Sequence, residues 1–171
     1  MISLRDVLDG TAGVLRGSAA PDLLFRRVWH DSRTVEPGDL FVALRGERHD
    51  GHDFVADAVR RGAAGALVEA RRAEEFADLG IPLIVVDDSL AALLRLASYW
   101  RRLFTVPVVA VTGSVGKTST KEAIASVLAQ RFRVVRSRAS FNTDVGVALD
   151  LLMIDPDTDV VVLEFGEAYR L

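Results

Sequence analysis

The chain has 171 residues, half of them hydrophobic, which is enough apolar material for one large domain or two small ones. Charged residues make up 26% and the formal net charge is −3, so no basic field indicates a nucleic-acid partner. The absence of cysteine excludes a disulfide framework and a thiolate nucleophile. We see no signal peptide and no apolar run near the roughly 18 residues of a membrane span, and therefore expect a cytoplasmic protein.

The first part of the chain predicts a small α/β domain. A helix is expected at 3–8, with Ser3 as its N-cap and Asp6 in its first turn. Apolar runs predict strands at 23–29, 40–44, 66–68 and 81–86, and helical spacing predicts helices at 54–61 and 88–103. The expected core stripe of the last helix comprises Leu90, Leu93, Leu94, Ala97 and Trp100.

We place a domain boundary near residue 104, which predicts domains at 1–104 and 105–171. The second domain is expected to contain strands at 108–111, 133–135 and 159–164 and helices at 117–131 and 145–153. The apolar face of its first helix is expected to be Ile124, Val127 and Leu128. Alternating strands and helices indicate an α/β fold with a largely parallel sheet. Because a P-loop domain normally needs about five strands, we expect this one to be incomplete.

The segment from 112 to 119 reads Thr-Gly-Ser-Val-Gly-Lys-Thr-Ser and joins an apolar strand to a helix. Two glycines in this position let backbone N–H groups turn toward a phosphate, and the helix N-terminus favours an anion. Lys117 lies in the first helical turn, where a cation is disfavoured unless a phosphate compensates it. We therefore predict a nucleotide site. Its predicted residues are Thr112, Gly113, Ser114, Gly116, Lys117, Thr118 and Ser119.

A magnesium ion is predicted beside this loop. The hydroxyl of Thr118 is one expected ligand, and Glu164 is the other because it ends an apolar strand at the edge where parallel sheets bind ligands. The alternative for Glu164 is a strand-end acid that faces solvent. His49 and His52 have the spacing of a metal pair, but a bare pair in a loop is more typical of ordinary hydrogen bonding.

The residues alone leave the roles of Arg33 and of the polar run 142–144 undecided. Arg33 can pair with a phosphate or lie at the surface. Asn142, Thr143 and Asp144 can contact phosphate, metal or a second substrate, or can serve as an N-cap cluster for the next helix.

The order of motifs resembles the amino-terminal part of a Mur ligase. The segment 30–46, reading HDSRTVEPGDLFVALRG, is similar to the uridine-nucleotide-binding segment of that family, and Asp50-Gly51-His52-Asp53-Phe54 continues it. The ATP loop of the family follows at 112–119, in the short form that lacks an early glycine. The loop sequence with Lys121-Glu122 resembles the members that add D-alanyl-D-alanine to UDP-N-acetylmuramoyl-tripeptide.

This resemblance implies a ligase that uses ATP and Mg²⁺ to form an amide through an acyl phosphate. It implies that Lys117 neutralises the γ-phosphate and that Thr118 and Glu164 hold Mg²⁺. It also implies that Ser32, Arg33 and the loop from Gly46 through Asp50 to His52 hold the uridine diphosphate. The expected substrates are a UDP-sugar peptide and an amino acid or dipeptide.

The chain also departs from the family pattern. In the loop 139–148 only Asn142 and Gly146 match cleanly, and Glu167 stands where the family has alanine. The family's modified lysine, second-metal histidine and third domain would lie beyond Leu171, so we expect no ligase turnover from this chain alone. Two alternatives stay open: a non-catalytic nucleotide-binding module of the same ancestry, and a Mur ligase that adds a different amino acid.

Overall fold

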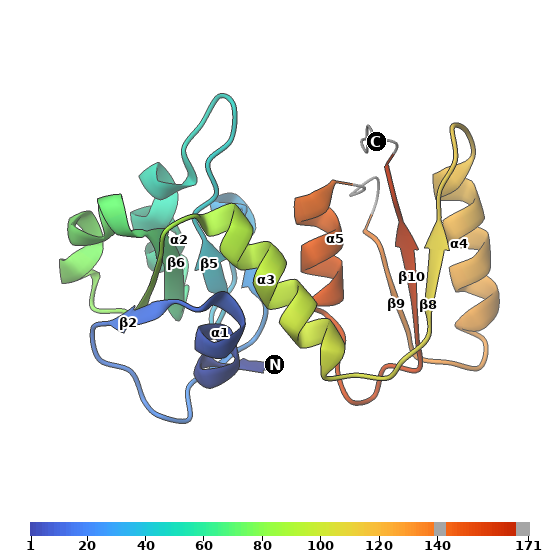
Figure 1. Ribbon diagram of the computed structural model, residues 1–171, viewed down its shortest axis with the longest axis horizontal. Helices are drawn as coiled ribbons and strands as arrows, with labels where there is room; N and C mark the ends of the chain where they lie inside the picture. The colour runs from blue at the N-terminus through green and yellow to red at the C-terminus, as the bar shows by residue number, and fades with distance from the viewer. Residues whose placement is uncertain (139–142, 167–171) are drawn as a thin grey trace. The chain divides into compact units, whose positions relative to one another are not determined.

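The computed structural model describes residues 1–138 and 143–166 and shows two compact units, Met1–Ser98 and the chain from Tyr99 onward (Figure 1). The division falls inside the last long helix of the first unit, while the domain limits 1–104 and 105–171 remain a prediction. No helix in the described ranges is both long and apolar enough to cross a membrane.

The first unit is built on a sheet of five strands in the order β2-β7-β6-β5-β4. Four of them run parallel, and β2 joins the edge antiparallel to β7. The strands of this unit are β1 (Ile2–Ser3), β2 (Val14–Arg16), β3 (Leu24–Phe25), β4 (Val28–Trp29), β5 (Leu40–Val42), β6 (Gly65–Glu69) and β7 (Leu83–Val86). Its helices are α1 (Leu4–Thr11), η1 (Ser32–Thr34), η2 (Gly51–Phe54), α2 (Val55–Arg60), η3 (Ala70–Leu79) and α3 (Ser89–Arg102), the η elements being 3₁₀ helices.

The single strand predicted at 23–29 is wrong, because the chain divides it in two. β3 pairs antiparallel with β1, and β4 pairs parallel with β5 in the main sheet. The break falls at Arg26 and Arg27, whose side chains pair with the carboxylates of Glu36 and Asp39. Because both arginines are engaged in ion pairs, this segment lacks the alternation of apolar and polar side chains that a continuous strand needs.

One face of this sheet packs against α2 and η3. The sheet contributes Phe41, Ala66 and Val68 to this core, α2 contributes Val55 and Ala58, and η3 contributes Ala73 and Phe76. No element was predicted over η3, a 3₁₀ helix in which Arg71, Arg72, Glu74, Glu75 and Asp78 alternate with a few apolar residues.

The N-cap predicted for α1 is confirmed. The Ser3 hydroxyl accepts a hydrogen bond from the Asp6 N–H, and the Asp6 side chain returns to the Ser3 backbone as a capping box. The core stripe predicted for α3 is partly wrong, since Leu90 and Leu94 are exposed. The buried residues of α3 are Ser89, Ala92, Leu93, Leu96, Ala97 and Trp100.

The second unit contains a parallel sheet of three strands in the order β8-β10-β9. Its elements are β8 (Val108–Val111), α4 (Lys117–Leu128), β9 (Val134–Arg136), α5 (Asp144–Leu151) and β10 (Val160–Glu164). Both helices contact β10, and the strands lie between α4 and α5 (Figure 1). Helices on both faces of a parallel sheet confirm the predicted α/β class.

The apolar face of α4 differs at one position from the prediction. Ala125 is buried against Val111 and Val162, and Ile124 and Leu128 pack at the rim of the same core. Val127 is 72% exposed, so it lies outside this face. The inward positions of α4 also include Lys121, which is fully buried.

Candidate functional site

The glycine loop between β8 and α4 has a backbone that only glycine adopts readily. Gly113 has a φ of 136° and Gly116 a φ of 78°, and a Cβ on either would meet no atom within 4 Å. The glycines are therefore required by conformation and not by crowding. Gly116 is the N-cap of α4, and Lys117 is its first residue. The Lys117 ammonium folds back and donates to the Gly113 carbonyl.

This loop exposes the side chains predicted to meet a nucleotide. Thr112, Ser114, Thr118 and Ser119 are exposed, and Lys117 is half-buried. The first turn of α4 leaves backbone N–H groups without helical partners, which is the arrangement that receives phosphate at a helix N-terminus.

Glu164 lies beside the loop because β10 is the sheet neighbour of β8. Glu164 is in register with Val111, and the Phe165 N–H donates to the Val111 carbonyl at 2.9 Å. The Glu164 side chain is 2% exposed, and its Oε1 accepts a hydrogen bond from the Thr118 hydroxyl at 3.2 Å. The two predicted magnesium ligands therefore meet, although they are distant in sequence.

The donor set at this point fits a magnesium ion. It consists of a hydroxyl and a carboxylate, both hard oxygen ligands, and the carboxylate oxygen Oε1 of Glu164 lies beside the Thr118 hydroxyl. Within residues 1–138 and 143–166, no group of three or more His, Asp or Glu side chains is gathered as a cation cage. Magnesium in nucleotide sites is usually held by one or two protein oxygens together with phosphate and water, which agrees with so small a set.

A buried polar cluster lies beneath Glu164. The Lys121 ammonium donates to the Ser137 carbonyl at 2.9 Å and lies 3.6 Å from Oε2 of Glu164. The Ser137 hydroxyl accepts from the Glu164 N–H at 3.0 Å, and its own N–H donates to the Val162 carbonyl. Residues from α4, β10 and the end of β9 thus converge on one serine.

Asp150 on α5 completes this cluster. It is 3% exposed, and burial raises its pKa to about 6. Hydrogen bonds from the Ser137 hydroxyl and the Arg138 N–H favour the charged form and limit this rise. One of its oxygens has no hydrogen-bond partner. The cost of burying this carboxylate is therefore only partly offset.

In the first unit, Ser32 and Arg33 lie in η1, which follows β4. Ser32 is buried at 8% exposure, whereas the Arg33 side chain is 83% exposed. The Arg33 guanidinium donates two hydrogen bonds to the Asp31 carboxylate, and this pairing lowers the pKa of Asp31. Arg33 therefore already has an anionic partner, which a ligand phosphate would have to displace or share.

Asp50 and His52 form a compact pair at the start of η2. The His52 ring is 1% exposed; its Nδ1 lies 2.6 Å from Asp50 Oδ1, and its Nε2 accepts from the Glu69 N–H at 2.9 Å. Burial opposes ionisation of Asp50, but hydrogen bonds from the His52 N–H and ring, helped by Arg72, lower its pKa to about 2. Both ring nitrogens of His52 are engaged within the protein, so this geometry favours a linking role over direct contact with substrate.

Gly46 lies on the first side of the turn that precedes this pair, and Glu47 and Arg48 form its tip. Its N–H donates to the His49 carbonyl at 2.9 Å, and Arg45 and Asp50 form an isolated antiparallel bridge. Gly51 closes the turn, with its N–H on the Leu44 carbonyl at 2.8 Å. The turn between them is exposed and therefore accessible to a ligand.

The loop before α5 is described only in part. Thr143 is the N-cap of α5, and its hydroxyl accepts from the Gly146 N–H at 3.2 Å, as one of the two interpretations expected. Asn142 and Glu167 lie outside the described residues, so their predicted roles stay predictions.

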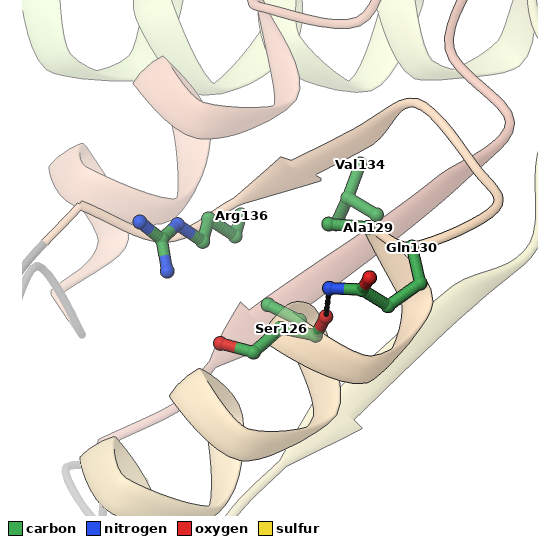
Figure 2. A pocket seen from close by; sticks show the side chains of 6 residues that line it. Ser126, Ala129, Gln130, Val134 and Arg136 are labelled. Carbon is green, nitrogen blue, oxygen red and sulfur yellow. Dashed lines mark hydrogen bonds between the residues drawn. The ribbon is translucent and has the colours of Figure 1, made fainter.

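A separate pocket of about 380 Å³ lies between the C-terminal half of α4 and β9 (Figure 2). Its lining includes Ser126, Gln130 and Arg136, with the Gln130 amide donating to the Ser126 carbonyl. Arg136 also pairs with the carboxylate of Glu122. This pocket contains none of the predicted site residues.

The sequence analysis assigned no role to Lys121, Ser137 or Asp150. A usable signal existed for Lys121, because it falls at helical spacing with Ile124, Ala125 and Leu128 on the inward face of α4. A lysine in a stripe of apolar residues indicates a buried partner.

The strand β8 passes through a glycine loop into α4, and an acid ends the neighbouring parallel strand, an arrangement typical of α/β proteins that bind phosphate at a helix N-terminus. Two family models match this chain: "Mur ligase family, catalytic domain" over residues 25–101 and "Mur ligase middle domain" over residues 111–170. The chain belongs to the Mur ligase family.

Curated relatives and solved structures agree with this membership. UDP-N-acetylmuramoyl-tripeptide–D-alanyl-D-alanine ligase from Synechocystis sp. is 43% identical over 85% of this chain, and the Escherichia coli enzyme of that name is 39% identical over 99%. The crystal structure of MurF from Acinetobacter baumannii aligns with 99% of the chain at a TM-score of 0.85 and 34% identity, covering 36% of that protein. The chain spans about a third of the length of its curated relatives, 32% and 36% for these two.

Proposed function

We propose that this chain is the amino-terminal part of a cytoplasmic ATP-dependent ligase of cell-wall precursor synthesis. The enzyme would join D-alanyl-D-alanine to UDP-N-acetylmuramoyl-tripeptide. The observation that carries the proposal is the pairing of Thr118 with Glu164 at the glycine loop of a Mur ligase chain. The names of the relatives support the choice of substrates, and a MurF ligase from Thermotoga maritima, 36% identical with a TM-score of 0.70, was solved in complex with ADP.

In the proposed reaction, the substrate carboxylate takes the γ-phosphoryl group of ATP and becomes an acyl phosphate. The amine of the dipeptide then attacks the acyl carbon, which releases phosphate and leaves an amide and ADP. Lys117 would leave the Gly113 carbonyl and pair with the transferring phosphate, where its charge offsets the charge that develops. Thr118 and Glu164 would hold Mg²⁺, which neutralises phosphate charge when bound.

The first unit would bind the uridine diphosphate end of the substrate. Ser32 and Arg33 in η1, and the turn from Gly46 to Asp50, are the proposed contacts. His52 would serve this site indirectly, because its ring joins Asp50 to the backbone of β6 and so positions the end of the turn. A basic side chain already paired to a carboxylate, as Arg33 is, can exchange that partner for a phosphate.

Calorimetric titration of the chain with UDP-N-acetylmuramoyl-tripeptide tests the proposal, with UDP and UMP as controls. We expect binding that strengthens from UMP to UDP to the full peptide substrate. Binding of ATP without binding of any uridine compound, in a chain shown to be folded by circular dichroism, would contradict the ligase. That result would favour a non-catalytic nucleotide-binding module.

A further inference from the structure

We infer that Lys121 is a positioning residue for the metal site and holds Glu164 in the orientation that presents one oxygen beside Thr118. The inference rests on the proposed function, because it takes Glu164 as a magnesium ligand. It concerns a buried side chain to which we assign no contact with substrate.

The first support is the burial of the Lys121 charge. Its side chain is 0% exposed, in the middle of a fold whose α4 is otherwise packed by apolar residues. Among the oxygens near its ammonium are the Ser137 carbonyl at 2.9 Å, Oε1 of Glu122 at 3.2 Å and Oε2 of Glu164 at 3.6 Å. Because lysine is almost never fully buried without partners, these contacts are what make the position tolerable.

The second support is that the two carboxylate oxygens of Glu164 face different partners. Oε1 accepts the hydrogen bond of Thr118 and faces the nucleotide loop, while Oε2 faces the Lys121 ammonium. A carboxylate held from behind by a fixed cation cannot turn both oxygens toward the loop. Lys121 thereby selects a single oxygen for the metal.

The third support is that one residue holds both partners. Ser137 accepts from the Glu164 N–H through its hydroxyl and from Lys121 through its carbonyl. Ser137, at the end of β9, thus fixes the backbone of Glu164 directly and its side chain through Lys121. Groups behind a metal ligand that orient it in this way typically contribute about 10–100-fold to metal affinity.

A purely structural role for Lys121 makes a different prediction. If the lysine only ties α4 to the end of β9 through the Ser137 carbonyl, its loss would weaken nucleotide binding equally with and without magnesium. If it positions Glu164, its loss would weaken only the part of nucleotide binding that depends on magnesium. The dissociation constant without magnesium divided by the dissociation constant with magnesium therefore separates the two roles.

The experiment measures the dissociation constant of ADP for the 171-residue chain, once with Mg²⁺ and once with EDTA. For Lys121→Met we expect the ratio of the two constants to fall by at least about tenfold. The constant in EDTA should change by less than about threefold, because the backbone of the glycine loop is untouched. Lys121→Gln keeps a donor for the Ser137 carbonyl and removes the charge, and it should behave as Lys121→Met does.

Three further variants complete the design. Glu122→Gln removes a carboxylate that touches the same ammonium from another side, and it should leave the ratio as in the unmodified chain. Glu164→Gln should abolish most of the magnesium dependence. The double variant Lys121→Met/Glu164→Gln should resemble Glu164→Gln alone, because Lys121 acts through that carboxylate.

Three results would overturn the inference: an unchanged or increased ratio in Lys121→Met and Lys121→Gln, equal losses with and without magnesium, or additive effects in the double variant. Folding is checked by thermal unfolding, and Lys121→Gln replaces Lys121→Met if the latter does not fold. If the unmodified chain itself shows no magnesium dependence, the proposed metal site fails and this inference with it. Strong magnesium dependence that survives in both lysine variants refutes the inference alone.

Discussion

At the scale of single residues, the buried polar side chains of the second unit connect packing to function. Lys121, Ser137 and Glu164 are each 2% exposed or less, and each uses a hydrogen bond or an ion pair to reach another element. Asp150 and Glu164 each have one oxygen without a hydrogen-bond partner, but that of Glu164 lies 3.6 Å from the Lys121 ammonium. A buried carboxylate that is incompletely paired costs stability whenever it is charged.

Asp150→Asn should stabilise the chain at neutral pH. The pKa of Asp150 is raised to about 6 in the folded protein, so the folded state binds the proton more tightly than the unfolded state. The favourable contribution of the protonated group is therefore complete below about pH 4 and is lost as the pH rises through 6. We expect the free energy of unfolding of the variant to exceed that of the unmodified chain by about 2–3 kcal/mol at pH 7.

Urea unfolding of both proteins at several pH values between about 4 and 7 measures this difference. The asparagine carbonyl can still accept from Ser137 and Arg138, so the hydrogen bonds at the site are retained. A difference that does not grow with pH would show that Asp150 is not the titrating group.

At the scale of elements, the turn between β5 and η2 depends on close backbone packing. A Cβ on Gly51 would lie 2.6 Å from the carbonyl oxygen and 2.7 Å from the nitrogen of Leu44, distances at which the backbone must shift. At Gly46 the nearest atom to a Cβ is the His49 carbonyl oxygen, at 3.3 Å, a tight contact that a backbone shift of a few tenths of an ångström relieves. Close backbone packing therefore requires glycine at position 51 but not at position 46.

Gly51→Ala should destabilise the first unit by about 1–3 kcal/mol, because two rigid backbone atoms must move. Gly46→Ala is the matched control and should cost at most about 1 kcal/mol, because Gly46 is exposed and its Cβ would approach only one backbone atom, at 3.3 Å. Thermal unfolding of both variants gives the comparison. Equal losses would mean that the approach to Leu44 is relieved without cost.

Element boundaries were predictable where a local signal marked them. The strand β10 is a continuous apolar run and lies within one residue of its predicted bounds, and α4 begins at Lys117 directly after the glycine loop, as predicted, but ends at Leu128, three residues before its predicted end. The short strands β1, β2 and β3 have only two or three residues each, too few to show a period of two. Their strand character comes from the partner strand and not from their own residues.

At the scale of the whole molecule, the proposed nucleotide site and the proposed uridine site belong to different compact units. The glycine loop and Glu164 lie in the unit that begins at Tyr99, and η1 and the Gly46 turn lie in the unit that ends at Ser98. Each unit has its own sheet, mixed in the first and parallel in the second, and its own set of proposed ligand residues.

Lys117→Ala should therefore separate the two binding activities. We expect ATP binding to fall below detection, because the loop loses the only charged side chain between Thr112 and Ser119. UDP binding should stay within about threefold of the unmodified chain, since Lys117 has its contacts in the other unit. Calorimetry with each ligand measures both, and a parallel loss of UDP binding would refute the assignment of two sites.

The sequence by itself determined the family, the α/β class and the glycine loop between strand and helix. These features depend on local order along the chain, in which a residue's neighbours in sequence settle what it does. Only the tertiary structure decided which polar residues became buried partners. Lys121, Ser137, Asp150 and Glu164 come from four separate segments, and His52 finds the backbone of β6. Their roles depend on burial, and burial is a property of the packed elements rather than of any one segment.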